Sequence, residues 1–157
     1  GIGQVSDREF FDGFRKLTGS HASGEQITEA TNAMLRYIPD EKKRILLALR
    51  AAGYKTFLLS NTINMHWRYC VDKLFPMDGY TVNDYFDHTF VSQEMHMKKP
   101  DDEIFQAVIA QAAIRPEETL FIDDLEMNCK AAERNGLHTF QNKQFDDWVD
   151  VLCTPNR

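Results

Sequence analysis

The stretch TLFIDD, residues 119–124, sets two carboxylates directly after a short run of mostly apolar residues. A run of this length without polar alternation is typical of a strand that is buried on both faces. Strands of that kind belong to parallel sheets covered by helices. The stretch therefore predicts an α/β fold in which Asp123 and Asp124 close a strand.

Working outward, residues 55–60 (KTFLLS), 88–92 and 138–141 predict three more strands. Apolar residues at helical spacing predict helices between and after them. These helices are expected from about Pro39 to Ala52, over 101–113 and 126–135, and from about Phe145 to Leu152. Alternating strands and helices imply right-handed crossovers, so we expect a Rossmann-like open parallel sheet with helices on both faces.

The first 38 residues differ from the rest because they predict helices only. Ser6 with Glu9 and Ser23 with Gln26 are capping-box pairs, and apolar residues at helical spacing follow each. We expect two antiparallel helices here, in a small domain over residues 1–38 beside an α/β core over residues 39–157.

The composition excludes several functions. The chain has 157 residues, 43% apolar and 27% charged, with a net charge of −6. An acidic chain with interspersed signs does not suit binding to a nucleic-acid backbone. No apolar run approaches the roughly 18 residues of a membrane span. Three separated cysteines suit a reducing compartment, so we expect a cytoplasmic protein. From the charge and the short apolar runs we expect no nucleic-acid or membrane partner. The sequence does not indicate which oligomeric state the protein adopts.

Polar residues follow the predicted strands: Ser60-Asn61-Thr62 after the first, a loop to Lys99 after the second, and Asp123-Asp124 after the third. The carboxyl ends of parallel strands meet at one edge of a sheet, where ligands bind. Hydroxyl and amide groups can hold phosphate oxygens, an ammonium can neutralise them, and two carboxylates can hold a hard cation. The pattern predicts a Mg²⁺-bound phosphate.

Each of these groups also has a structural explanation. The Ser-Asn-Thr sequence is an ordinary turn and helix cap, and a lysine before proline is commonly a solvated loop charge. Adjacent carboxylates are a stronger signal, because they repel each other unless a cation lies near them. The five histidines show no metal-ligand spacing, and His96, in the loop before Lys99, is the best functional candidate among them.

Three segments stand in a set order: LLSNT (58–62), SQEMHMKKPD (92–101) and LFIDDLEMN (120–128). They resemble motifs two, three and four of the haloacid dehalogenase (HAD) superfamily, in its phosphatase branch with a small helical cap. That branch includes alpha-D-glucose-1-phosphate phosphatases and the N-terminal domain of soluble epoxide hydrolase. Residues 1–38 resemble the later part of the cap.

The resemblance implies a role for each matching residue. Ser60 and the amide of Asn61 would bind phosphate, and Lys99 would balance the charge of the phosphoryl group and of the nucleophile. Asp124 would bind Mg²⁺ directly, Asp123 would be its indirect partner, and Asn128 would brace the loop. The implied activity is hydrolysis of a small phosphate monoester, possibly a sugar phosphate, through an aspartyl-phosphate.

One part of the family pattern is absent from the printed chain. Members carry their nucleophilic Asp and an acid–base Asp after a first, central strand, and no such strand or motif occurs in these residues. The chain also opens on Gly1, so we expect a fragment whose nucleophile lies upstream and which alone is unstable and inactive. A non-catalytic phosphometabolite-binding module is the alternative. A dehalogenase is disfavoured because its chemistry needs no metal.

Overall fold

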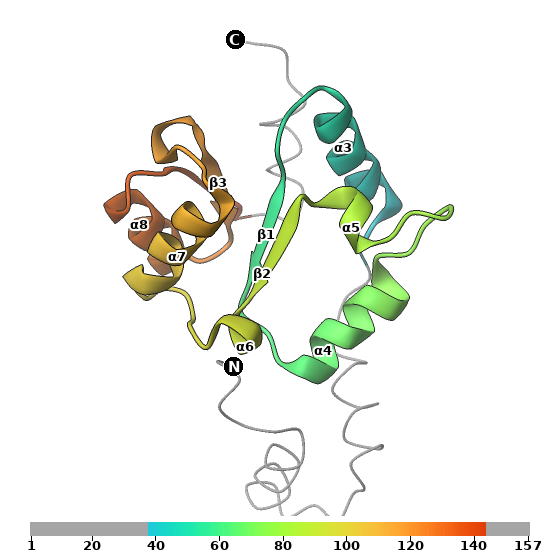
Figure 1. Cartoon of the computed structure of the whole chain (residues 1–157), viewed down its shortest axis with the longest axis horizontal. Helices are drawn as coiled ribbons and strands as arrows, with labels where there is room; N and C mark the ends of the chain where they lie inside the picture. Colours follow the sequence, from blue (N-terminus) through green and yellow to red (C-terminus); the bar gives the residue numbers. More distant parts are fainter. Residues whose placement is uncertain (1–37, 144–157) are drawn as a thin grey trace, which may run out of the picture. The chain divides into compact units, whose positions relative to one another are not determined.

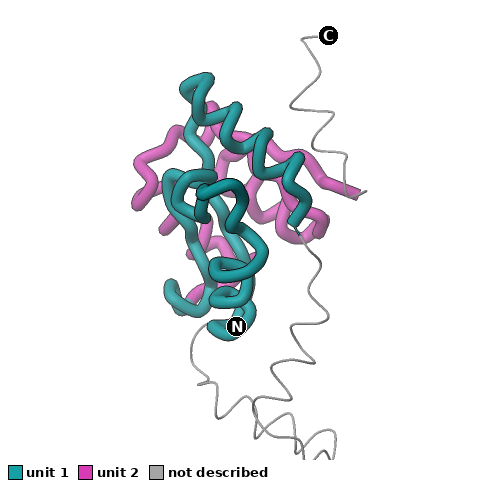
Figure 2. Tube along the Cα trace, turned by 90° about the vertical axis from the view of Figure 1, so that its right-hand side faces the viewer, with its two compact units in different colours: residues 1–96 teal, residues 97–157 magenta. Residues whose placement is uncertain are grey.

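The computed structural model describes residues 38–143. Its chain divides into two compact units, one ending at His96 and the other beginning at Met97, which Figure 2 draws in two colours. The predicted helices before residue 38 and after residue 143 lie outside the described residues, as does Cys153, the last of the three cysteines. The expected boundary between cap and core therefore stays a prediction.

The first unit contains two parallel strands with helices before, between and after them (Figure 1). β1 (Phe57–Ser60) pairs with β2 (His88–Val91), in a register that runs from Phe57 opposite His88 to Ser60 opposite Val91. Its helical segments are α3 (Asp40–Ala51), α4 (Asn64–Tyr69), a π-helical turn η1 (Cys70–Leu74), α5 (Val82–Tyr85) and α6 (Ser92–Met95).

The second unit repeats this plan. β3 (Leu120–Asp123) pairs in parallel with β4 (His138–Gln141), and Asp123 stands opposite Gln141. Its helical segments are α7 (Asp102–Ala112), a 3₁₀ turn η2 (Pro116–Glu118) and α8 (Glu126–Arg134). α8 joins the two strands as a crossover helix, and Gly136, at a φ of +88°, makes the turn into β4. No helix within residues 38–143 is long and apolar enough to cross a membrane.

The four predicted strands and their parallel pairing are confirmed, with shifts of one or two residues at their ends. β1 begins at Phe57 rather than Lys55, because Thr56 bonds outside the strand ladder. The helix expected over 101–113 ends at Ala112, since Ala113 has a φ of +52°. Within residues 38–143 the strands form two sheets of two strands each. The further central strand stays a prediction.

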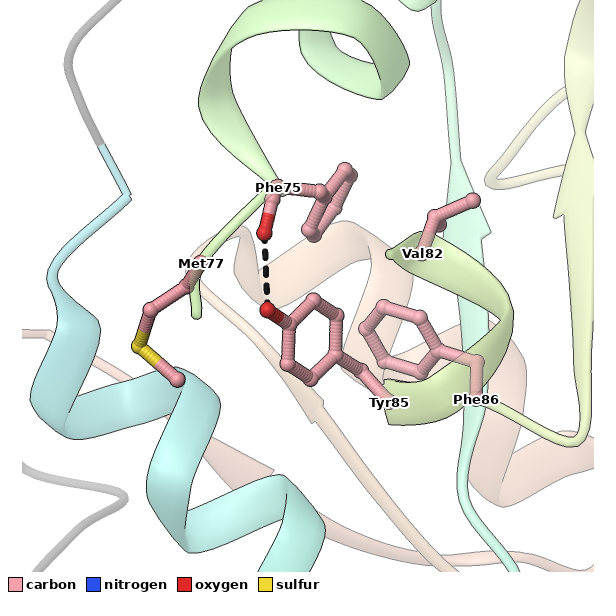
Figure 3. Close-up of a cluster of buried hydrophobic side chains, with 5 residues drawn as sticks. All are labelled: Phe75, Met77, Val82, Tyr85 and Phe86. Carbon is pink, nitrogen blue, oxygen red and sulfur yellow. Dashed lines mark hydrogen bonds between the residues drawn. The ribbon is translucent and has the colours of Figure 1, made fainter. Parts of the chain in front are cut away.

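The core of the first unit is a largely aromatic cluster supplied by residues 75–86, between η1 and β2. Phe75, Met77, Val82, Tyr85 and Phe86 are buried together (Figure 3). The Tyr85 hydroxyl donates to the Phe75 carbonyl at 2.8 Å, so this buried polar group is satisfied. α5 carries Val82 and Tyr85 of this cluster, and a capping box between Thr81 and Asp84 stabilises the start of this short helix.

Charged and polar side chains bind the amino ends of β1 and β2 together. The Asp87 carboxylate accepts from the Arg50 guanidinium at 3.1 Å and from the Thr56 amide at 2.8 Å. Thr56 in turn donates its hydroxyl to the Tyr85 carbonyl at 2.6 Å. These bonds join α3, β1 and the entry to β2, and so fix the register of the sheet.

Candidate functional site

The Asp123 carboxylate is the centre of a buried polar cluster in the second unit. It ends β3, and it accepts from the Lys99 ammonium at 2.6 Å on one oxygen. The other oxygen accepts from the Leu125 amide at 2.9 Å and from the Asn128 side chain at 3.1 Å. Strand, loop and helix therefore all hold the same carboxylate, because α8 begins directly after the turn that contains Leu125.

Lys99 is not a solvated loop charge. Its side chain is 9% exposed, and its ammonium also lies 5.7 Å from the centre of the Phe121 ring. That ring stands edge-on to Phe105 of α7 at 5.3 Å. The aromatic surroundings shield the charge from water, so its attraction to Asp123 is stronger than at the surface.

The environment sets the charge state of Asp123. Burial alone would raise the pKa of this carboxyl group. The hydrogen bond and charge of Lys99, with the bonds from Leu125 and Asn128, outweigh burial and lower the pKa below its usual value. Asp123 is therefore ionised at neutral pH, and its negative charge is balanced from within the protein.

Asp124 has the opposite surroundings. It is exposed, and within the described part of the chain its carboxylate has no hydrogen bond or ion pair, while its backbone carbonyl accepts from Gln141 at 3.2 Å. The two adjacent carboxylates are thus divided, one buried against a lysine and one facing solvent. Lys99 balances the charge of Asp123 and water screens that of Asp124, so the repulsion between the two carboxylates is weak.

Asp124 is an exposed carboxylate, a group that could act as a ligand of a hard divalent cation. Mg²⁺ in proteins is commonly held by one or two carboxylates, with water and substrate phosphate as its other ligands. Among residues 38–143 no group of three or more His, Cys, Asp or Glu side chains could enclose a metal. Asp124 can offer both of its oxygens, whereas three donors already occupy Asp123. Direct coordination therefore suits Asp124, and contact through water suits Asp123.

The first unit carries the other predicted residues. Ser60 ends β1 and is half-buried, and Asn61 follows it in an exposed loop. Sequence reasoning missed the partner of this loop, Ser92, which accepts from the Thr62 amide at 2.9 Å and donates to the Thr62 carbonyl at 3.1 Å. Ser92 follows β2 directly as Asp124 follows β3, and that position was its signal. His96 is exposed and ends α6 in a left-handed conformation.

The structure thus brings Lys99, Asp123 and Asn128 into contact, with Asp124 next along the chain, while Ser60 and Asn61 belong to the first unit. Parallel strands, a crossover helix and polar residues after the strands define a Rossmann-like α/β protein. The sequence model of the haloacid dehalogenase-like hydrolases matches residues 6–136. The chain belongs to this family.

Several known proteins are similar to the chain over nearly its whole length. It is 31% identical over 150 residues to the D-ribitol-5-phosphate phosphatase of Bacteroides thetaiotaomicron, covering 96% of this chain and 72% of that protein. An HAD family enzyme from the same organism, solved as an aspartate-to-alanine mutant with magnesium and inorganic phosphate, has a TM-score of 0.91 at 43% identity. That match covers 96% of this chain and 74% of the other.

A predicted HAD-like hydrolase from Porphyromonas gingivalis has a TM-score of 0.86 at 32% identity, over 99% of this chain and 77% of the other. The fold and the family are therefore supported by solved structures from two organisms.

Proposed function

We propose that the protein is a Mg²⁺-dependent phosphatase that hydrolyses the phosphate monoester of a small metabolite, with sugar and polyol phosphates as its substrate class. The observation that carries the proposal is the buried Lys99–Asp123 pair beside the exposed Asp124. Relatives named as phosphatases of D-ribitol 5-phosphate and of glyceraldehyde 3-phosphate support the substrate class.

Asp124 would hold Mg²⁺ directly and Asp123 would contact it through water. When bound, Mg²⁺ would supply positive charge to the phosphoryl oxygens. Lys99 would add charge to the same group and keep neighbouring carboxylates ionised, as it does for Asp123. Asn128 and the Leu125 amide hold Asp123 in place, so this part of the site needs little reorganisation during the reaction.

In the first unit, Ser60 would donate its hydroxyl and Asn61 its amide to phosphoryl oxygens. Both follow the carboxyl end of a parallel strand, the position at which ligands bind in open α/β sheets. Preorganised donors of this kind stabilise the charge that develops on a transferred phosphoryl group. Asn61 is exposed, so this part of the loop is open to solvent.

The nucleophile would be an aspartate outside these 157 residues. Its carboxylate oxygen would form a bond to phosphorus while the bond between phosphorus and the ester oxygen breaks, and an acid group would give its proton to the leaving alcohol. The acid group, now deprotonated, would take a proton from a water molecule that attacks phosphorus, and the bond between phosphorus and the carboxylate oxygen would break, which releases inorganic phosphate and restores the carboxylate. None of the residues in the described cluster has to form a covalent bond.

The test is phosphate release by the protein in its natural length. D-ribitol 5-phosphate, glyceraldehyde 3-phosphate and p-nitrophenyl phosphate would each be assayed with Mg²⁺ and with EDTA. We expect metal-dependent turnover that Ser60→Ala and Lys99→Ala each lower on the order of 10²- to 10³-fold. Variants within threefold of the parent would refute these roles. Phosphate binding without turnover would instead favour a non-catalytic binding module.

A further inference from the structure

The Ser92 side chain holds the backbone of the loop after β1. Ser92 is completely buried, and its hydroxyl accepts from the Thr62 amide at 2.9 Å while it donates to the Thr62 carbonyl at 3.1 Å. A hydroxyl has one proton to donate and lone pairs to accept with, so the two bonds are compatible. One buried side chain thereby satisfies both polar groups of one residue in an adjacent loop.

These bonds extend the sheet beyond its last backbone pairing. The β1–β2 ladder ends where Ser60 stands opposite Val91, and the chain then leads from Ser60 toward α4 (Figure 1). Ser92, the next residue after Val91, bonds Thr62 with its side chain in place of its peptide group. Asn61 therefore lies between two fixed points, the strand pairing at Ser60 and the hydroxyl bonds at Thr62.

We infer that Ser92 is a positioning residue, which holds the Ser60–Thr62 loop in the conformation that binds phosphate. This inference rests on the proposed function of Ser60 and Asn61. Ser92 is buried and bonds the loop from the side of β2, so it acts through Thr62 rather than on the substrate. A loop held at both ends presents its donors without losing conformational freedom at each binding event, which raises affinity.

The matched pair of variants is Ser92→Ala and Thr62→Ala. Ser92→Ala removes the hydroxyl and both bonds. Thr62→Ala removes only a side chain whose hydroxyl bonds the Ile63 carbonyl at 3.3 Å, and it keeps the backbone groups that Ser92 holds. A merely local loss of packing speeds amide exchange at position 62 in both variants, whereas loss of the Ser92 bonds speeds it only in Ser92→Ala.

The first measurement is hydrogen exchange, which does not depend on activity. The Thr62 amide should exchange at least about tenfold faster in Ser92→Ala than in the parent, since losing its buried acceptor exposes it to local opening. The β1 and β2 amides should exchange as in the parent. Unchanged exchange at Thr62 would show that the Ser92 hydroxyl does not hold the Thr62 backbone, and would overturn the inference. General acceleration would show that Ser92 supports the whole unit, which would also overturn a specific positioning role.

The second measurement is binding of inorganic phosphate and turnover of p-nitrophenyl phosphate by the protein in its natural length. We expect Ser92→Ala to lower phosphate affinity and kcat/KM on the order of tenfold, as the loss of two hydrogen bonds predicts. Mg²⁺ affinity without phosphate should stay within twofold of the parent in Ser92→Ala. Faster exchange at Thr62 with unchanged phosphate affinity would overturn the positioning role. If the parent neither binds phosphate nor hydrolyses p-nitrophenyl phosphate, the proposed function fails. The exchange result still decides whether Ser92 holds the Thr62 backbone.

Discussion

The Lys99 ammonium lies 2.6 Å from the Asp123 carboxylate, and the two side chains are only 9% and 6% exposed. Breaking a buried pair leaves one uncompensated charge, which typically costs about 3–5 kcal/mol, whereas replacing both charges by apolar groups costs much less. The pair therefore has a structural effect that can be separated from its proposed role with phosphate.

We predict that Lys99→Met and Asp123→Leu each lower the free energy of unfolding by roughly 3 kcal/mol or more. The double variant should lose less free energy of unfolding than the two single variants added together, by at least about 1 kcal/mol. The reason is that neither charge is then left buried alone. All three variants should lose turnover. The measurement is chemical denaturation of the four proteins.

The control is the exposed pair of Arg115 and Glu118, whose groups lie 3.2 Å apart in the same unit. The same cycle with Arg115→Met and Glu118→Leu should give a coupling below about 1 kcal/mol, since water screens this pair. Equal coupling in both pairs would contradict the importance of burial at Lys99.

Asp124 should be needed for metal-dependent activity and unimportant for stability. Because its side chain is exposed, Asp124→Ala should change the free energy of unfolding by no more than about 0.5 kcal/mol. Mg²⁺-dependent turnover should be abolished. Glu117→Gln is the matched control, an exposed carboxylate before the opposite end of β3, and it should leave turnover unchanged. Undiminished activity of Asp124→Ala would rule out its role as the metal ligand.

Two buried amides should respond oppositely to apolar replacement. Asn128 bonds Asp123, whereas neither polar atom of the Gln93 side chain finds a partner within residues 38–143. Replacing a hydrogen-bonded amide by an apolar side chain leaves its buried partner without a hydrogen bond, which lowers the free energy of unfolding by about 1–3 kcal/mol. We predict this loss for Asn128→Leu, and for Gln93→Met no loss or a gain, both measured by denaturation. A loss at Gln93 as large as at Asn128 would show that its amide is bonded after all.

His66 should make the protein sensitive to mild acid. Burial lowers the pKa of this imidazole below 6.5, and its Nε2 is buried without a partner among the described residues. As the pH falls below 6.5, the unfolded chain takes up a proton at this site before the folded protein does, so stability is lost. Between pH 7.5 and 5.5, His66→Gln should therefore lose less stability than the parent. Parallel curves would contradict a lowered pKa.

The strands could be predicted from the sequence because their signal is local. TLFID and KTFLLS are apolar runs with polar ends, and such runs mark buried parallel strands wherever they occur. Asp123 and Ser60 could be chosen for the same reason, since each ends one of these runs. Position along a strand thus determined the candidate residues before any contact was known.

The contacts that give these residues their properties could not be predicted in that way. Lys99 and Asp123 are 24 positions apart, and nothing local indicates that the lysine is buried against an aromatic ring. Ser92 and Thr62 are 30 positions apart, and their bond depends on the register of β1 with β2. The burial of Gln93 could not be predicted either, because its helix has only four residues, too few to show a pattern of buried and exposed positions.

The anchor at Asp87 has a consequence for how such a protein can diversify. Asp87, Arg50 and Thr56 tie the amino ends of β1 and β2, whereas Ser60 and Ser92 lie at or just beyond their carboxyl ends. A strand of four residues is only about 13 Å long, yet this length separates the bonds that set the register from the loop proposed to meet the ligand. Selection can therefore alter the loops at the carboxyl ends of the strands for a new substrate, while the bonds at the amino ends preserve the sheet. Laboratory evolution of specificity is best confined to the loops at the carboxyl ends.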